Sequence, residues 1–426
     1  MKKLLLALCI LPVIICCSGG DDEVDRQTPD DEVSVETPEE LDPRKAFPQN
    51  VEFKNCIKPN HVTQDVLNSD VKSYYTYWRN KYVKPSNGGT QGGGYYVEMR
   101  GTGGDGSEIT TSEAHGYGMI IFALMAGADQ QAKKYYDGMY NMFDKHRSTG
   151  NAYCMSWVIH NTESSDHDQG SASDGDLDVA YSLLLADQQW SSEGQLKYLD
   201  DAREMIEKGL KKSIVHPVSK RVMLGDWDSN QYSTRSSDWM AGHFRAFQQV
   251  TQDDYWNATA ETVYSLIESL TKSYTSENGL MPDFIVGQSP QPAPENYLDE
   301  FKETDEYNWN ACRYPWRITT DYAHFNTAKA KAAMLKLNTF IREQTNGNPA
   351  QIKAGYYLSG KPMVAYSDGA FTAPLVASCI VDDGAQVYLN KGWDILKESK
   401  GGYYDDTLCL LNMLLISGNW WNPVEP

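Results

Sequence analysis

The stretch ASDGDLDVAYSLLLADQQW, residues 172–190, joins three alternating aspartates to a strongly apolar run. Apolar side chains recurring at helical spacing over 176–189 predict a buried helix. Capping of that helix explains one of Asp174, Asp176 and Asp178, but not all three. The acids resemble a calcium loop, yet the spacing and the closing Glu of an EF-hand are absent. We therefore expect this segment to contribute both a core helix and carboxyl groups with a chemical role.

The alternation of apolar helical periodicity with loops rich in Gly, Asn, Asp and aromatic residues continues from about Ser112 onward. Strand-like pieces such as 95–99 are few and short, and no short-period repeat suggests a solenoid. The loops before the helices hold the densest sets of carboxylates and aromatic rings. Consecutive helical hairpins with such loops gathered at one end predict an all-α toroid with a few short strands. The candidate helices are 113–125, 130–145, 176–189, 195–213, 238–249, 254–272, 320–344, 371–381, 385–398 and 407–416.

Charge and aromatic content narrow the classes of partner. The 426 residues include 58 acidic and 38 basic side chains, a formal net charge of -20, which repels polyphosphates and argues against nucleic acid. Eleven Trp and 27 Tyr are more rings than a core of this size needs, and such rings stack on sugars. We expect a monomer. The cysteines of the body show no Cys-x-x-Cys pair, so we expect no disulfide framework, no metal and no cofactor; they are Cys56, Cys154, Cys312, Cys379 and Cys409.

The N-terminus predicts export. Two lysines precede an apolar run over 4–15 that is too short to span a bilayer and has the length of a signal-peptide core. The run ends in a segment that resembles a bacterial lipoprotein signal, with Cys17 as the better lipidation candidate and Cys16 as the alternative; a plain cleaved signal is the other interpretation. Residues 18–46 are acidic and Pro-rich and predict a disordered tether, followed by one catalytic domain over 47–426. We expect an outer-membrane lipoprotein at the cell surface or in the periplasm.

A second segment, TSEAHGYGM at 111–119, presents Glu113 at the first turn of a predicted helix after a capping Ser or Thr. The neighbouring glycines let a substrate approach the backbone. A Glu at this position also complements the helix dipole, so its position alone does not decide its role. His115, one turn away, is expected to line the same cleft, whereas His243 and His324 lie within helical patterns and are expected to be structural.

Six segments occur in one order along the chain: 112–119, 172–190, 235–238, 279–284, 310–317 and 417–420. Together they resemble glycoside hydrolase family 8 over nearly the whole domain. The resemblance implies an (α/α)6 barrel with a long cleft and an inverting endo attack on β-1,4-linked polysaccharide. Chitosan or mixed-linkage β-glucan is the expected substrate, with xylan or cellulose as alternatives. It also implies that Glu113 is the proton donor and that Asp174 binds and helps to distort the sugar at the cleavage point.

The general base is assigned less directly from the sequence than the general acid. An inverting glycosidase needs a second carboxylate about 6.5 to 9.5 Å from the acid to activate water. Many members of the family place an Asp where this chain has Asn310, and an amide cannot accept the proton of water at neutral pH. The branch with chitosanase and lichenase activity has the same Asn and supplies a Glu from the preceding loop. Ungapped counting from Asn310 predicts Glu300, matching of the Asn-x-Leu-acid text predicts Asp299, and Glu303 is the third candidate.

Other residues are expected to contact substrate. Arg313 and Asn310, from the RYPWR segment and its approach, are expected to hold sugar or the base loop, as is Tyr117. Trp227, Trp239 and Trp309 are expected to be stacking platforms, with core packing as the alternative. Arg317, like Arg313, is expected to hold the base loop or a sugar hydroxyl, with a structural ion pair as the alternative.

Two functions of other classes compete with the hydrolase hypothesis. One is an inactive surface glycan-binding lipoprotein, motivated by Asn310. The other is a polysaccharide lyase or unsaturated-uronide hydrolase on a similar toroid, which usually needs sets of Tyr, His or Arg around an acidic sugar.

Overall fold

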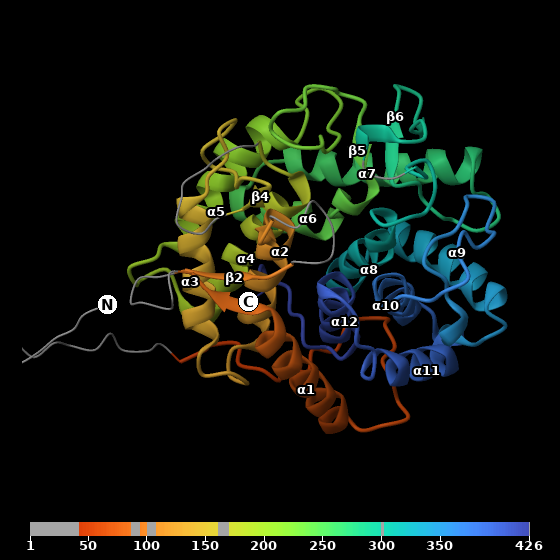
Figure 1. Ribbon diagram of the computed structural model, residues 1–426, viewed down its shortest axis with the longest axis horizontal. Coiled ribbons are helices and arrows are strands. Elements are labelled where there is room, and N and C mark those ends of the chain that lie inside the picture. The colour runs from red at the N-terminus through yellow and green to blue at the C-terminus, as the bar shows by residue number, and fades with distance from the viewer. Residues whose placement is uncertain (1–41, 87–93, 100–107, 161–169, 300–301, 426) are drawn as a thin grey trace, which may run out of the picture. The chain divides into compact units, whose positions relative to one another are not determined.

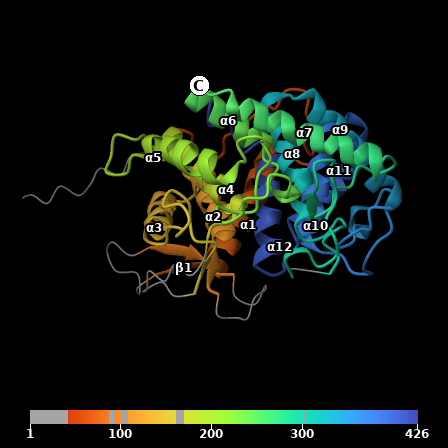
Figure 2. The same ribbon diagram turned by 90° about the horizontal axis from the view of Figure 1, so that it is seen from above.

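The computed structural model describes residues 42–86, 94–99, 108–160, 170–299 and 302–425, and the side chain of Asp299 lies outside this description. The described chain is mainly helical (Figures 1 and 2). Six helices pack side by side in a closed ring, in which each contacts the next in the order α2, α4, α6, α8, α10, α12 and back to α2. The ring consists of α2 (Ser112–Met125), α4 (Ser173–Trp190), α6 (Ala241–Thr251), α8 (Tyr314–Phe325), α10 (Gly369–Ala377) and α12 (Tyr403–Ile416).

A second layer of helices covers the ring from outside. Each outer helix packs on the inner helix next to it in sequence, and α1 packs on α12 and so completes the outer layer. The sequence prediction of an (α/α)6 barrel is therefore confirmed. The outer helices are α1 (Gln64–Tyr82), α3 (Ala132–Lys145), α5 (Tyr198–Glu204) with its π-helical continuation Met205–Ile214, α7 (Tyr255–Ser273), α9 (Ala328–Gln344) and α11 (Gln386–Leu396).

Burial distinguishes the two layers. Inner helices are apolar on nearly every side, as expected for helices enclosed by neighbours. In α2 every residue except Glu113 is buried, and Glu113 lies in the first turn. The outer helices bury one face only; α1, for example, presents Tyr74, Tyr75 and Trp78 to the core.

The strands are short and lie in the connections at the helix ends. They form two antiparallel pairs, β1 with β2 and β3 with β4, and one three-stranded sheet in the order β5, β6, β7. The pair Arg235 and Phe284 lies in register between β5 and β6. The strands are β1 (Val83–Pro85), β2 (Tyr95–Val97), β3 (Thr110–Thr111), β4 (Val158–Ile159), β5 (Thr234–Arg235), β6 (Phe284–Val286) and β7 (Gln291–Pro292).

Several helix predictions were wrong in detail. Helix α1 was missed, because its buried face consists of tyrosines and a tryptophan rather than aliphatic residues. The predicted helix 371–381 is α10 followed by a 3-10 turn, Ser378–Val381, and the predicted helix 238–249 begins only at Ala241. Helix α4 begins at Ser173, three residues before the predicted start at Asp176, so Asp174 lies in its first turn.

Two glycines allow α2 and α4 to approach closely. A Cβ at Gly175 would lie 2.4 Å from the backbone carbonyl carbon of Ser112, and one at Gly116 would lie 2.6 Å from Cβ of Asp178. Neither space admits a side chain, so the two helices contact each other backbone to backbone. This contact brings the first turns of α2 and α4, with Glu113 and Asp174, next to each other.

Candidate active site

Residues from the first turns of α2, α4 and α12 and from the start of α8 meet at one end of the barrel. Arg313 is the centre: its Nη1 lies 2.5 Å from Oε2 of Glu113 and 2.6 Å from Oδ2 of Asp174. The same nitrogen donates to the hydroxyl of Tyr117 at 3.2 Å, and the hydroxyl of Tyr403 donates to Oε1 of Glu113 at 3.2 Å. The structure thus brings together four predicted site residues, Glu113, Tyr117, Asp174 and Arg313.

Glu113 is accessible from one side. Its side chain is 19% exposed, whereas those of Asp174 and Arg313 are each 3% exposed. Thr111 caps α2 by accepting from the backbone N–H of Ala114, which leaves the Glu113 carboxyl free to turn toward Arg313. A partly exposed carboxyl above a buried ion pair has the placement required of a group that exchanges a proton with a ligand.

The environment separates the two acids. Burial raises the pKa of Glu113 to about 7; Arg313 opposes that rise, and Asp174 adds to it. Burial acts on Asp174 as well, but Arg313 and Arg235 outweigh it and hold the pKa of Asp174 below its usual value. At neutral pH Asp174 is ionised while Glu113 still carries a proton in a large share of molecules. Two carboxyls with pKa values driven apart mark a site in which one acts as an acid and the other as a fixed charge.

The side-chain amide of Asn310 bonds to both Arg313 and Asp283. Its Oδ1 accepts from Nη2 of Arg313 at 2.9 Å, and its Nδ2 lies 3.4 Å from Oδ2 of Asp283. Asp283 is fully buried and also accepts the backbone N–H groups of Asn308, Asn310 and Ala311. A carboxylate at position 310 would meet the Asp283 carboxylate, a like charge, so this chain needs an amide here. Asn310 consequently orients Arg313.

The loop predicted to carry the base is described only in part. Glu300 and the side chain of Asp299 lie outside the described residues. The side chain of Glu303 is 34% exposed, and its Oε1 lies 4.0 Å from Nζ of Lys302. The backbone N–H of Tyr297 donates to Thr304 Oγ1, which ties the two ends of the segment 297–304 together.

A chain of contacts joins this segment to the acid pair. The ring of Tyr297 lies 5.3 Å from that of Phe284, and the guanidinium carbon of Arg235 lies 5.0 Å from the centre of the Phe284 ring. Arg235 is one of the two cations that lower the pKa of Asp174. The segment 297–304 is therefore connected to the acid pair through the β5–β6 strand pair.

Comparison with known proteins identifies the family. The model of "Glycosyl hydrolases family 8" matches residues 75–418. The chain belongs to this family. It is 42% identical over 383 residues to an endoglucanase of Bacillus sp. (strain KSM-330), covering 89% of this chain and 82% of that one, and 38% identical over 386 residues to a beta-glucanase of Niallia circulans, covering 89% and 92%.

A solved structure agrees with the sequence relatives. The apo beta-1,3-1,4-glucanase from Paenibacillus sp. X4 superposes with a TM-score of 0.84 at 38% identity, covering 89% of this chain and all of the other. The protein is therefore a glycoside hydrolase on an (α/α)6 barrel, and the resemblance inferred from the six segments is confirmed.

The family-8 hydrolase has exposed aromatic rings near the acid pair. Trp227 is 55% exposed, and its indole N–H donates to the carbonyl of Ser171 at 3.1 Å. Trp157, which the sequence prediction missed, is 40% exposed, and its backbone N–H donates to the carbonyl of Gly170. The indole of Trp227 and the backbone of Trp157 thus bond to the same dipeptide, 170–171, just before α4, and both rings are exposed.

Two other sequence predictions were wrong. Trp239, expected as a stacking platform, is fully buried, and its indole N–H donates to Thr234 Oγ1 at 3.2 Å. His115, expected to line the cleft, is also buried and contacts the carbonyl of Met139. Both lie on helical or turn segments whose pattern cannot show which side faces the cleft. Trp309 is half-buried and packs against the rings of Phe371 and Tyr404.

Two residues of the site, Tyr403 and Asp238, were not predicted from the sequence. Tyr403 begins α12 and contacts Glu113, but its segment carries no motif that would single it out. Asp238 is fully buried, and burial together with the nearby Asp174 raises its pKa to about 7. It lies in the segment 235–238, one of the six that carried the family resemblance, so this acid was visible in the sequence but was not recognised.

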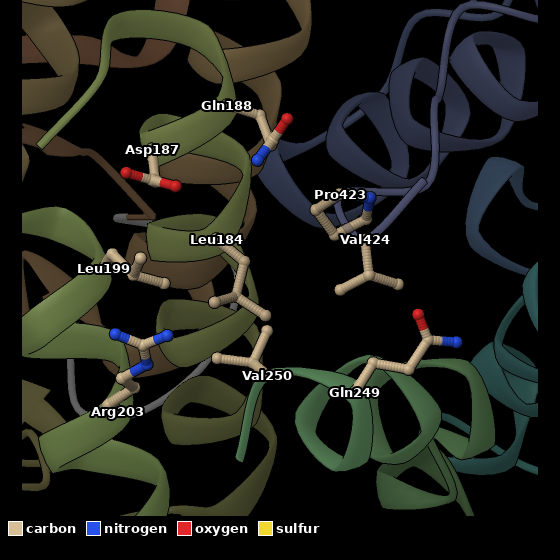
Figure 3. A pocket seen from close by; sticks show the side chains of 9 residues that line it. All are labelled: Leu184, Asp187, Gln188, Leu199, Arg203, Gln249, Val250, Pro423 and Val424. Atoms are coloured by element: carbon tan, nitrogen blue, oxygen red, sulfur yellow. The ribbon is translucent and has the colours of Figure 1, made fainter. Parts of the chain in front are cut away.

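A separate hollow lies at the opposite ends of the inner helices. It has a volume of about 270 Å³ and is lined by residues of the C-terminal parts of α4 and α6, of α5 and of the chain end, including Leu184, Arg203, Gln249 and Val424 (Figure 3). None of the candidate site residues lines it. Among the described residues, no group of three or more His, Cys, Asp or Glu side chains is arranged to hold a metal ion.

Proposed function

We propose that this hydrolase is an inverting endo-β-glucanase that cleaves mixed-linkage β-1,3-1,4-glucan, with Glu113 as the general acid. The observation that carries the proposal is the separation of the Glu113 and Asp174 pKa values around one guanidinium. The substrate class is supported by the names of the relatives, an endoglucanase, a beta-glucanase and a solved beta-1,3-1,4-glucanase. Chitosan, xylan and cellulose are the alternatives that the test below separates.

The proposed reaction uses the acid pair as follows. Glu113 donates its proton to the glycosidic oxygen as the bond from that oxygen to the anomeric carbon breaks. A water molecule attacks the same carbon from the opposite face and gives its proton to a carboxylate of the loop ahead of Asn310. The new hydroxyl is therefore α where the bond was β. Asp174, ionised and held by Arg313, is expected to bind a hydroxyl of the sugar whose bond is broken.

The base is proposed from the loop that contains Glu300, Asp299 and Glu303. Asn310 cannot serve, because its amide is engaged by Arg313 and Asp283. The contacts from Tyr297 through the β5–β6 pair to the acid site support a loop that faces Glu113 across a bound sugar.

The stereochemical test is proton NMR of the anomer first released from barley mixed-linkage glucan, with cellulose, xylan and chitosan in parallel. We expect the α anomer from the mixed-linkage glucan and slower or no turnover of the other three. A β anomer as the first product would overturn inversion, and preferred turnover of chitosan or xylan would overturn the substrate class.

The base is tested with the variants Glu300→Gln, Asp299→Asn and Glu303→Gln. The variant that lacks the true base loses most of its activity, and added azide, a nucleophile that needs no general base, restores turnover with an inverted glycosyl azide as product. The other two variants serve as controls in the same loop. Full activity of all three variants would overturn the assignment of the base to this loop.

A second candidate function is glycan binding without catalysis, which the amide at position 310 favours. The variant Glu113→Gln separates the two functions. If the wild-type protein degrades glucan and Glu113→Gln still binds it but does not degrade it, the binding-only function is excluded. If neither protein degrades any of the four polysaccharides, binding alone is the function that remains.

We also propose that the hydrolase is a monomeric lipoprotein of the outer membrane. Its support is the sequence of residues 1–46, which lie almost entirely outside the described part of the chain. No helix among the described residues is both long and apolar enough to cross a membrane. We expect the wild-type protein in the membrane fraction of a lipoprotein-processing host and Cys17→Ser in the soluble fraction, with Cys16→Ser as the matched control. If Cys16→Ser is found in the soluble fraction while Cys17→Ser stays in the membrane fraction, the lipidated residue is Cys16.

A further inference from the structure

A second ion pair lies one helical turn beyond the acid site. Arg313 is the N-cap of α8 and Arg317 follows it by four residues, while Asp178 follows Asp174 by four residues in α4, so the two side chains of each set lie on one face. Nη1 and Nη2 of Arg317 contact Oδ1 and Oδ2 of Asp178 at 2.8 and 2.6 Å. We call Arg313 with Asp174 the upper pair and Arg317 with Asp178 the lower pair.

We propose that the lower pair positions the upper pair and balances the charge around Glu113, so that Asp178 and Arg317 act on catalysis without touching substrate. This inference rests on the proposed function, because it assigns the proton of Glu113 a catalytic role. It adds two residues to the machinery of the site, both of which are buried.

The geometry of the lower pair is rigid. Both side chains are essentially without solvent exposure, at 1% for Arg317 and 0% for Asp178. The two parallel contacts form a planar fork, which fixes direction as well as distance. His243 of α6 adds a third contact, from Nε2 to Oδ1 of Asp178 at 2.9 Å, and its ring stacks on Tyr181 at 3.8 Å. The lower pair thus joins α4, α6 and α8 in one register.

Helix α2 connects the lower pair to the upper pair. The ring of Tyr117 lies 5.6 Å from the guanidinium carbon of Arg317, while its hydroxyl accepts from Arg313. Gly116 packs directly on Cβ of Asp178, so α2 cannot move away from or toward α4 without disturbing the lower pair. Glu113 is one turn from both of these residues on the same helix. A shift of the lower pair would therefore move Glu113 relative to Arg313.

Charge gives the second link. The groups that face Asp178 are Arg317 from α8, neutral His243 from α6 and Tyr117 from α2; burial lowers the pKa of His243, which keeps it uncharged. Arg317 also lowers the pKa of Glu113, although less than Arg313 does. The Arg317–Asp178 pair is electrically balanced, so removal of either of its charges changes the net charge near Glu113.

The experiment compares the pH dependence of kcat/KM for wild type, Asp178→Asn, Arg317→Gln and the double variant on a β-glucan that the wild type hydrolyses. Loss of the Asp178 anion favours ionisation of Glu113, so the basic limb moves to lower pH. Loss of the Arg317 cation has the opposite sign, so the limb moves to higher pH. Each shift should be on the order of 1 to 2 pH units, as for a unit charge one to two helical turns away at an effective dielectric constant of about 20.

The double variant separates electrostatic positioning from simple damage. With both charges removed, the basic limb should return to within a few tenths of the wild-type pH, because the two shifts cancel. The matched control is Asp321→Asn, one turn further along α8: Asp321 is also buried and contacts Arg245 at 2.9 Å, but not the site. We expect it to lower the melting temperature without moving the basic limb.

The outcomes are distinct. Opposite shifts of the single variants with recovery in the double variant support the inference. Unchanged limbs, shifts in one direction for both, or the same shift in Asp321→Asn would overturn it. If a single variant does not fold, the double variant, which leaves no unpaired buried charge, still has to show a wild-type limb. A wild type that hydrolyses no glucan would instead overturn the proposed function and leave the ion-pair geometry as it is.

Discussion

The contact between Tyr403 and Glu113 makes a prediction whose sign and size follow from the structure. The phenolic O–H donates to Oε1 of Glu113 at 3.2 Å and so favours the ionised carboxylate. Tyr403→Phe removes that donor and keeps the ring, which packs edge to face on Tyr82. The pKa of Glu113 should therefore rise above its value of about 7 in the wild type.

The magnitude follows from the length and exposure of this hydrogen bond. A long bond to a partly exposed carboxylate contributes on the order of 1 kcal/mol, which corresponds to a pKa rise of about 0.7 units. A general acid is active when protonated, so the basic limb of kcat/KM moves from about pH 7 to about pH 7.7. At pH 8 the variant should retain roughly three to four times more of its own plateau activity than the wild type does.

The assay is initial-rate hydrolysis of barley glucan between pH 5 and 10, with kcat/KM fitted to the basic limb. Tyr404→Phe is the matched control, since the neighbouring hydroxyl donates to the carbonyl of Trp309 at 2.8 Å rather than to Glu113. Its limb should stay at the wild-type pH. A limb of Tyr403→Phe that is unchanged or displaced to lower pH would refute the reasoning that this phenol stabilises the ionised acid.

Three further predictions concern stability and binding. Burial raises the pKa of Asp176 to about 8, so between about pH 4 and 8 the folded state binds a proton that the unfolded chain has lost. The free energy of unfolding should therefore fall by up to about 1.4 kcal/mol for each unit by which the pH rises across this range. Asp176→Asn should flatten that slope in urea melts. Gly175→Ala places a methyl group 2.4 Å from a backbone carbon of α2 and should cost about 2 to 3 kcal/mol by urea unfolding and most of the activity, whereas Gly194→Ala, with nothing within 4 Å, should cost neither. Trp227→Ala should raise KM for long glucans by about 5- to 30-fold, as expected for the loss of about 1 to 2 kcal/mol of ring contact, and should leave the free energy of unfolding unchanged. The control Tyr274→Ala removes an exposed ring at the end of α7 and should leave KM unchanged. An equal rise of KM in both variants would argue against a stacking role for Trp227.

Much of the architecture was predictable from local patterns. Apolar periodicity identified most of the inner helices, because a helix enclosed on all sides must be apolar all round and such runs stand out in sequence. Helix α1 escaped, since Tyr74, Tyr75 and Trp78 bury large faces without the aliphatic pattern. The first turn of α4 was identified as a chemical segment because it holds more acids than capping needs, whereas Glu113 of α2 was singled out through the resemblance of the six ordered segments to the family.

The arrangement of the site required the fold. Sequence order says nothing of which side of a turn faces a groove, so Trp239 and His115 were assigned to the cleft although both are buried. Trp157 and Tyr403 were missed for the same reason, since neither belongs to a motif and each reaches the site only by packing.

By itself the sequence determined the helical composition and the family, because helical periodicity and short ordered segments are local properties of the chain. Only the tertiary structure decided that Glu113 and Asp174 share the guanidinium of Arg313 and have separate pKa values. Proton affinity depends on burial and on charges a few ångströms away, and in a barrel those charges come from helices distant in sequence.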